Sequence, residues 1–310
     1  MRGFIIVVTI IHSCIISKAQ DKIQFAKTNE EKATETNLKC GVTNPSGLVF
    51  RFGEMLADFG EYPWMVAIIK KSDTPSTQWS DKDYLNGGTL IHTSVVLTSS
   101  YGLEKIKPNE IKCRAGEWHK TAEDEDYVHQ ERNVRRIVIH KDYFKDSFYN
   151  AISMVFLEQP FDLNDAPHVG VACVGPTLPE PGTKCFGTGW GMSAVSGKSD
   201  ILKKIPVNLL SADDCETKMR KTRLGKIYRL HDSLTCAGSA DDTCKGDLGA
   251  PLVCPVKDDS TRYVLYGMSA FRIHEEGAPC IYVKVPAFYD WIGERMGEEG
   301  FNSSTYTYVP

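Results

Sequence analysis

The 310-residue chain lacks the usual features of membrane, zinc-binding and nucleic-acid-binding proteins. Its formal net charge is -4, so it has no excess of positive charge that would attract nucleic acid as a partner. Its cysteines form no C-x-x-C pair, and no histidine stands at ligand spacing from them, so we expect neither a metal nor a cofactor. Beyond the N-terminus, no stretch approaches the roughly 20 apolar residues of a membrane-spanning helix.

One apolar run of some length stands at the N-terminus. Arg2 precedes an apolar stretch from Phe4 to Ile16, and a small-residue cleavage site ends at Ala19. The run is too short to span a bilayer, but it has the pattern of a secretory signal peptide. The sequence therefore predicts that residues 1–19 are a cleaved signal peptide and that the product is secreted and extracellular.

The cysteines are consistent with an oxidising compartment. Cys14 leaves with the signal peptide, and nine of the ten cysteines remain. In a secreted protein such a set predicts a disulfide framework. Because nine is an odd number, at least one thiol is unpaired or bonds to another chain.

Short strand-like runs separated by Gly, Pro, Asn and Asp clusters fill the chain from residue 62 onward. The clearest are WMVAII at 64–69, GTLIHTSVVLTSS at 88–100, RRIVIH at 135–140, ISMVFL at 152–157, KKIPVNLL at 203–210 and YVLYGMSAF at 263–271. Many short strands with turns between them predict an all-β sandwich or barrel. One helix is predicted over 286–296, where Phe288, Trp291, Ile292 and Met296 fall on one face.

The two ends of the mature chain differ in composition from its body. Residues 20–39 are polar and charged, and Cys40 opens a turn-rich stretch, so we expect residues 20–51 to be a flexible segment and linker. Residues 298–310 are predicted to form a polar tail. Within it, Asn302-Ser-Ser is a glycosylation sequon, which predicts a glycan in a secreted protein.

Four motifs occur in the order and at the spacing of one known family. They are VVLTSSYG at 95–102, YNAISMV at 149–155, CFGTGWG at 185–191 and CKGDLGAP at 244–251. Together with the matching cysteines they resemble the trypsin-like serine proteases. Stretches such as EYPWMVAI, RAGEWH and DTCKGD resemble the arthropod clip-domain serine protease homologues, which take part in immune cascades such as melanisation. Residues 20–39 contain no cysteine, so the six-cysteine clip domain usual in that family has no counterpart there.

The resemblance implies a fold and a set of disulfides. Residues 52–297 would form two antiparallel six-stranded β-barrels with a C-terminal helix and a cleft between the barrels. The disulfides implied by position are Cys40–Cys173, Cys185–Cys254, Cys215–Cys236 and Cys244–Cys280. Cys113 is left over, and two interpretations stay open for it: a buried thiol that packs as a small hydrophobe, or an intermolecular disulfide.

The catalytic chemistry of this family needs a hydroxyl, an imidazole and a carboxylate that act together. At the matching positions this chain has Leu248 for the nucleophile, Tyr101 for the base and Ala151 for the orienting carboxylate. A phenol ionises near pH 10 and is a poor base at neutral pH, so we expect a pseudoenzyme without catalytic residues. The disulfide that lies beside the family's catalytic histidine is also missing. Its two positions hold Asn86 and Gly102, and we expect the loop of Tyr101 to be looser as a result.

Other parts of the family's active site are kept or altered. The backbone N–H groups of Gly246 and Leu248 match the oxyanion hole. Asp242 matches the carboxylate of the trypsin specificity pocket, whereas Phe271 and Arg272 replace the usual Trp and Gly of its rim. We hypothesise that Arg272 enters the pocket and pairs with Asp242, and the alternative is that Arg272 points to solvent.

Activation by cleavage is also in question. The candidate cut is Arg51–Phe52, but Phe52 is not the aliphatic residue that usually forms the new terminus. The family's acidic partner for that terminus is retained as Asp247. We therefore expect Asp247 to have a structural role instead.

A charged segment marks a candidate binding surface. Six cations crowd into KMRKTRLGKIYR: Lys218, Arg220, Lys221, Arg223, Lys226 and Arg229. They predict a docking site for a protein or an anionic polymer. The alternative is a solvated helix face and loop without a partner. The acidic stretch at 123–126 is a counterpart of opposite charge.

The sequence favours a secreted, catalytically inactive serine protease homologue that acts by protein binding. It would be a regulatory cofactor or a decoy in an extracellular protease cascade of innate immunity, with proteases or zymogens as partners. Two alternatives stay open: an atypical or weak trypsin-like endopeptidase, and a venom-type inhibitory effector.

Overall fold

The computed structural model describes residues 39–44, 47–48, 55–71, 79–80, 82–121, 127–191, 199–238, 247–257 and 259–308. Residues from Cys40 to the C-terminus form one compact unit. Several predicted features lie outside the described residues: the signal peptide 1–19, the cut at Arg51–Phe52, the acidic stretch 123–126, Asp242, Cys244 and Gly246. Within the described ranges, no helix is long and apolar enough to cross a membrane.

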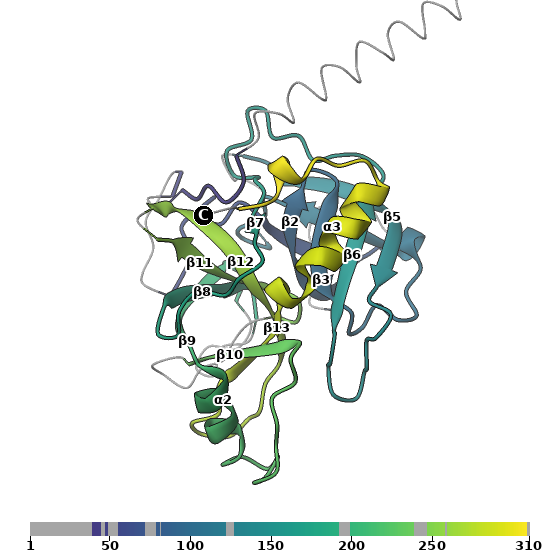
Figure 1. The fold of residues 1–310 in the computed structure, drawn as a ribbon. Helices are drawn as coiled ribbons and strands as arrows, with labels where there is room; N and C mark the ends of the chain where they lie inside the picture. Colours follow the sequence, from purple (N-terminus) through teal and green to yellow (C-terminus); the bar gives the residue numbers. More distant parts are fainter. Residues whose placement is uncertain are drawn as a thin grey trace, which may run out of the picture. The chain divides into compact units, whose positions relative to one another are not determined.

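Six antiparallel strands close into a first barrel (Figure 1). They are β1 (Met65–Lys70), β2 (Tyr84–His92), β3 (Val95–Ser99), β4 (Ile111–Ala115), β5 (Gln130–Ile139) and β6 (Ile152–Leu157). Around the barrel the order is β1-β2-β3-β6-β5-β4, and β4 pairs back onto β1. Both β3 and β6 are buried along their whole length. This explains why their sequences are mainly apolar runs instead of alternating patterns.

The second half of the chain forms a second barrel. Its strands are β7 (Cys173–Val174), β8 (Lys184–Gly189), β9 (Lys203–Leu209), β10 (Leu234–Gly238), β11 (Pro251–Val256), β12 (Asp259–Phe271) and β13 (Cys280–Lys284). Six of them run in the order β11-β8-β9-β10-β13-β12, and the pairing of β11 with β12 closes the ring. The short β7 is added outside this ring, parallel to β12.

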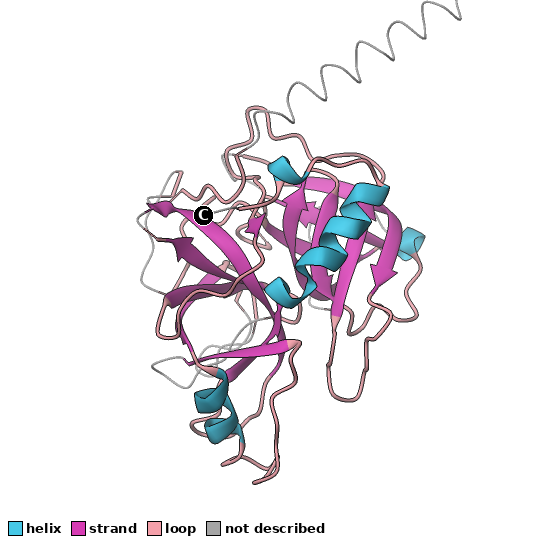
Figure 2. Cartoon of the chain, in the orientation of Figure 1, coloured by secondary structure: helices cyan, strands magenta, loops and turns pink. Residues whose placement is uncertain are grey.

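In the described part of the chain, helix is limited to short segments around the strands (Figure 2). A first 3-10 turn, η1 (Pro108–Glu110), precedes β4. The helix α2 (Ala212–Met219) leads toward β10, and it begins where the Ser211 side chain accepts a hydrogen bond from the N–H of Asp214.

The predicted C-terminal helix is present. A 3-10 turn, η2 (Val285–Phe288), continues into α3 (Tyr289–Glu298), which buries Ile292 and Met296. Just beyond α3, Glu299 pairs with Arg136 of β5 at 2.7 Å, which anchors the end of the helix on the first barrel. The prediction of an all-β protein with two antiparallel six-stranded barrels and a C-terminal helix is confirmed.

Disulfides join three of the cysteine pairs that the resemblance implied. These are Cys40–Cys173, Cys185–Cys254 and Cys215–Cys236. Cys280 is also disulfide-bonded, and its expected partner Cys244 lies outside the described residues.

The segment after α3, predicted as a polar tail, packs against the body of the protein. A short 3-10 turn, η3 (Ser303–Thr305), begins at Asn302. Beyond it, Thr307 forms a parallel bridge with Val174 of β7. Thr305 and Tyr306 are buried, so this segment contributes two side chains to the interior although its composition is mainly polar.

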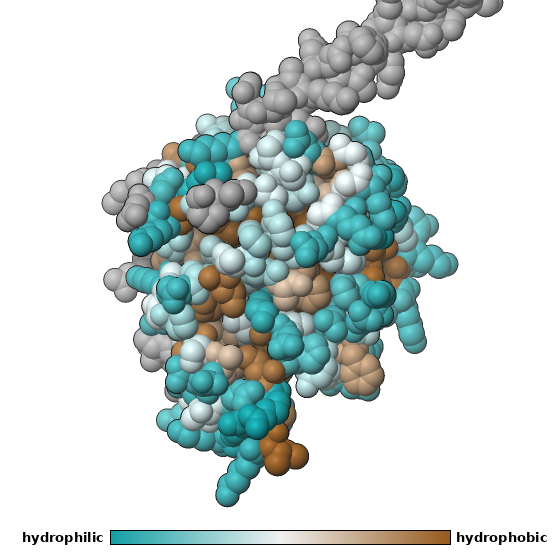
Figure 3. All heavy atoms as spheres, viewed as in Figure 1, coloured by the Kyte–Doolittle hydropathy of each residue, from teal (hydrophilic) through white to brown (hydrophobic). Residues whose placement is uncertain are grey.

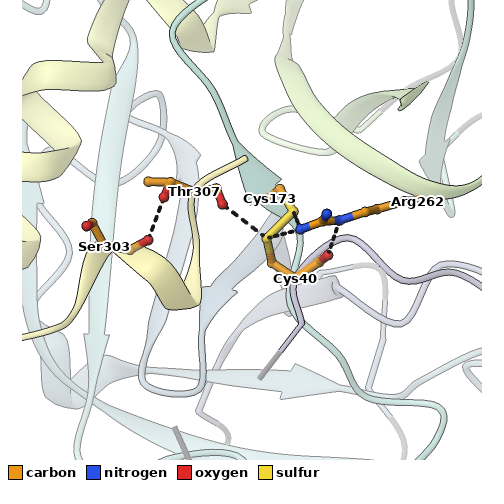
Figure 4. Close-up of a disulfide and its surroundings, with 5 residues drawn as sticks. All are labelled: Cys40, Cys173, Arg262, Ser303 and Thr307. Carbon is orange, nitrogen blue, oxygen red and sulfur yellow. Dashed lines mark hydrogen bonds between the residues drawn. A yellow bond between two sulfur atoms is a disulfide. The ribbon is translucent and has the colours of Figure 1, made fainter. Parts of the chain in front are cut away.

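The same segment covers the disulfide Cys40–Cys173 (Figure 4). The carbonyl oxygen of Thr307 lies 3.7 Å from Cys40 Sγ. From the other side, Arg262 Nε donates a hydrogen bond of 3.2 Å to the carbonyl of Cys40. Both sulfurs are withdrawn from solvent as a result.

Candidate functional site

The base position, Tyr101, lies directly after β3. Asn86 of β2 holds this loop, because its Nδ2 donates hydrogen bonds to the carbonyls of Ser99 (3.1 Å) and Tyr101 (3.0 Å). Gly102 is close by, since a Cβ on it would lie 3.9 Å from Asn86 Oδ1. Asn86 thus stands in the place of the missing disulfide and fastens the loop by hydrogen bonds. The sequence identified only the missing cysteines, and the looser loop that we expect from their loss stays a prediction.

The orienting position, Ala151, lies at the start of β6 and is fully buried. Its carbonyl accepts a hydrogen bond of 3.3 Å from the N–H of Ser100, the residue before Tyr101. The nearby hydroxyls of Ser153 and Ser100 bond to each other at 2.9 Å, and both residues are buried. This pair therefore does not supply an exposed nucleophile.

The nucleophile position, Leu248, is fixed through its backbone. Its carbonyl accepts a hydrogen bond of 2.8 Å from Gly87 N, next to Asn86. The following Gly249 has a positive φ of 76°, and a Cβ on it would lie 2.5 Å from the carbonyl oxygen of Gly87. A side chain at Gly249 would push the two barrels apart. The structure therefore brings the three predicted positions together, and none of them carries the family's catalytic group.

Two histidines, His92 and His231, have contacts that occupy their rings. His92 stacks on Phe301 with ring centroids 3.9 Å apart, and burial lowers its pKa to about 4. A serine–histidine pair exists between Ser233 Oγ and His231 Nδ1 at 2.8 Å. Ser233 is only 3% exposed, and its Oγ already accepts a hydrogen bond from Asn150 N at 3.0 Å. This hydroxyl is part of a closed local network and is not presented to a substrate.

Three aromatic rings join across the site, which the sequence did not predict. Phe148 stacks on Tyr101 with centroids 5.0 Å apart, and it lies 5.2 Å from Phe271 at the end of β12. Lys145 Nζ lies 5.4 Å from the centre of the Tyr101 ring. Phe148 has a positive φ of 58°, a strained conformation for a residue with a Cβ. We call Tyr101, Phe148 and Phe271 the aromatic cluster.

Asp247 is half-buried and is hydrogen-bonded between the two barrels. Its Oδ2 accepts hydrogen bonds from the Tyr84 hydroxyl (3.0 Å) and from Trp190 N (2.7 Å). Burial raises the pKa of Asp247 to about 6. Gly189 leaves room for it, since a Cβ there would lie 2.6 Å from Oδ2. With partners from both barrels, the carboxylate has its hydrogen bonds without a newly cut terminus.

Of the remaining predicted site residues, some depend on partners outside the described residues and one, Cys113, is fully described. Arg272 follows β12 and is half-buried, but Asp242 lies outside the described residues, so their pairing stays a prediction. The same holds for the oxyanion-hole position Gly246. Cys113 of β4 is a fully buried free thiol whose pKa is raised by burial. This burial favours the small-hydrophobe interpretation and argues against an intermolecular disulfide.

Two six-stranded antiparallel β-barrels, with the positions of the catalytic residues at their junction, form the serine protease fold. The chain belongs to the trypsin family, whose model matches residues 52–292. It is 39% identical over 292 residues to phenoloxidase-activating factor 2 of Galleria mellonella, with 88% of this chain and 94% of the relative covered.

Two further relatives come from Anopheles gambiae. The inactive CLIP domain-containing serine protease A8 is 32% identical, with 83% of this chain and 71% of the relative covered. The inactive CLIP domain-containing serine protease A28 is 31% identical, with 88% of this chain and 72% of the relative covered. The chain is thus a trypsin-family homologue of proteins that are named inactive.

Proposed function

We propose that this protein is a secreted serine protease homologue without catalytic activity, which acts by binding other proteins of an extracellular protease cascade. The observation that carries the proposal is the chemistry at Tyr101, Ala151 and Leu248. These positions lie together in the fold, but they offer no nucleophile, no base that works at neutral pH and no orienting carboxylate.

The size of the expected loss supports a binding role. In this chemistry the removal of one triad member costs about 10⁴- to 10⁶-fold in turnover, and the three members act as a unit. A residual rate from binding alone would be far below that of a working protease. The hydroxyls of Ser100 and Ser153 are buried and bonded to each other, so they do not replace the missing serine.

The aromatic cluster supports a cofactor over a substrate decoy. Tyr101 and Phe148 come from the first barrel and Phe271 from the second, and the contact between the rings of Phe148 and Phe271 bridges the two at the degenerate centre. A decoy would have to admit a substrate-like segment beside these rings. A cofactor needs only a stable surface, and contacts between rings of this kind stabilise the barrel junction.

The relatives' names indicate which cascade to examine. One of them is called a phenoloxidase-activating factor, and two others are called inactive proteases. For this chain we propose partners among the proteases and zymogens that generate phenoloxidase activity. The N-terminal signal peptide predicted from the sequence supports secretion into the same compartment.

Two assays test the proposal. In the first, the purified protein is incubated with fluorogenic Arg and Lys amides, before and after limited trypsin treatment, and we expect no turnover. In the second, a phenoloxidase zymogen and its activating protease are mixed with and without the protein, and we expect the phenoloxidase yield to change. Turnover that titrates with an active-site probe would overturn the proposal, and so would an unchanged yield without binding to either component.

A further inference from the structure

The loop after α2 carries the most exposed large hydrophobic side chain among the described residues. Ile227 is 91% exposed, and Leu224 in the same loop is 37% exposed. The space-filling view shows apolar atoms at the end of this projecting loop, among hydrophilic side chains (Figure 3). Single exposed apolar residues are common on protein surfaces, so exposure alone does not indicate a binding site. The structure and charge of the surrounding loop have to be considered as well. We call the end of α2 and the loop that follows it, residues 218–230, the basic loop.

The basic loop is built as a fixed turn. The disulfide Cys215–Cys236 joins α2 to β10 at its base. Gly225 has a positive φ of 79°, which permits the tight reversal. Its N–H donates to the carbonyl of Thr222 at 3.0 Å, and the N–H of Tyr228 donates to the carbonyl of Gly225 at 3.1 Å. Ile227 is therefore presented on an ordered turn.

Glu216 of α2 ties the two sides of the loop together. Its carboxylate accepts hydrogen bonds from Leu230 N (3.0 Å) and Arg229 Nη1 (3.1 Å), and it also pairs with Arg220. Arg220 Nε in turn donates to the carbonyl of Tyr228 at 3.0 Å. A surface held in this way loses little conformational freedom when a partner binds, which favours affinity.

The charge of the loop is only partly neutralised. Arg220 and Arg229 share Glu216, and Arg223 pairs with Glu275 at 3.5 Å. The exposed lysines have no ion-pair partner among the described residues; they are Lys218, Lys221 and Lys226. The loop is therefore a positive projection on a chain whose net charge is -4.

We propose that the basic loop is a docking surface for a protein partner that presents an apolar pocket rimmed by carboxylates. The pocket would receive Ile227, and the rim would face Lys221 and Lys226. This inference rests on the proposed function, since the partner would be a component of the same cascade. Interfaces draw much of their affinity from a few anchor side chains buried in pockets of the partner, and charged groups around them steer the encounter and fix the register.

A membrane fits the same surface less well. Binding at a bilayer surface uses a wide apolar face or several inserted side chains, and here one isoleucine stands almost alone. A second copy of the chain is the other candidate occupant. The experiment distinguishes a membrane and a second copy of the chain from the proposed protein partner.

The test compares Ile227→Asp with the matched control Val128→Asp. Val128 is 73% exposed and lies before β5 on the first barrel, so both variants place a carboxylate in solvent and should fold like the wild type. Binding is measured by biolayer interferometry to the purified phenoloxidase zymogen and to its activating protease. We expect Ile227→Asp to weaken binding about 10- to 100-fold, which corresponds to losing a buried isoleucine, and Val128→Asp to leave it unchanged.

The lysines give a second readout. The double variant Lys221→Glu with Lys226→Glu should weaken binding and should also flatten its dependence on salt concentration. A loss of affinity with an unchanged salt dependence would contradict a carboxylate rim.

The outcomes separate the two proposals. If the wild type binds neither component and does not change the phenoloxidase yield, the proposed function fails and this inference fails with it. If the wild type binds and Ile227→Asp behaves like Val128→Asp, only the docking surface is overturned. The docking surface is also overturned if Ile227→Asp abolishes co-sedimentation with vesicles of phosphatidylcholine and phosphatidylserine, or converts a dimer to a monomer, while it leaves binding to the zymogen and protease unchanged.

Discussion

Replacement of Asp247 by asparagine should remove a pH dependence from the stability of the fold. Burial raises the pKa of this carboxyl to about 6 in the folded protein, whereas an aspartate in an unfolded chain titrates near 4. The folded state therefore holds the proton more tightly than the unfolded state does. Its contribution to stability is fully present below about pH 4 and is lost as the pH rises through about 6.

The size of the effect follows from the two pKa values. Between them, the free energy of unfolding falls by about 1.4 kcal/mol per pH unit, or roughly 3 kcal/mol in total. Asp247→Asn does not titrate, and its side-chain oxygen can still accept from the Tyr84 hydroxyl and from Trp190 N. The free energy of unfolding of the variant minus that of the wild type should therefore rise by about 2 kcal/mol from pH 4 to pH 7, since the unfolded aspartate is already partly ionised at pH 4.

The assay is denaturant unfolding followed by tryptophan fluorescence at several pH values between 4 and 8, with the disulfides intact. Trp190 lies beside Asp247, so the signal reports on this region. Asp146→Asn, on an exposed loop, controls for the loss of one charge. A difference between Asp247→Asn and the wild type that stays flat with pH would refute the assignment of a raised-pKa carboxyl.

Three further predictions concern the degenerate centre and the C-terminus. Asn86→Ala should lower the free energy of unfolding by about 1–3 kcal/mol in the same assay, because the buried carbonyl of Ser99 and the partly buried carbonyl of Tyr101 lose their donor; an unchanged value would mean that the loop is held by other contacts. Leu248→Ser should hydrolyse no Arg or Lys amide, because the restored hydroxyl has no base beside it, and measurable turnover would show that another group acts as the base. Asn302→Gln should abolish a glycosidase-sensitive mass shift of the protein secreted from insect cells, and no shift in the wild type would exclude a glycan at this exposed position.

Much of the architecture could be predicted because it is recorded in local patterns. Apolar runs separated by turn residues predicted the strands, and the resemblance of the motifs to the trypsin-like serine proteases implied the two barrels that they form. The helical face of Ile292 and Met296 predicted α3. The strand and helix signals depend on neighbouring residues, and such signals survive in a single sequence.

The parts that could not be predicted depend on distant residues. Tyr101, Phe148 and Phe271 form one cluster, but no periodicity links positions that far apart in the chain. Asn86 was recognised as a lost cysteine, and only its hydrogen bonds show that it takes over part of the same task. The tail was expected to be polar, and its two buried residues are visible only once β7 lies beside it.

The disulfide Cys40–Cys173 has a consequence for any cleavage of the protein. It joins residues 133 positions apart into a covalent loop, and a cut anywhere between the two cysteines opens that loop without separating the pieces. A two-chain form would therefore keep the mass of the intact chain under non-reducing conditions and would split only after reduction. Because Thr307 and Arg262 cover the sulfurs, a reductant reaches this tether only after the C-terminal segment has moved away.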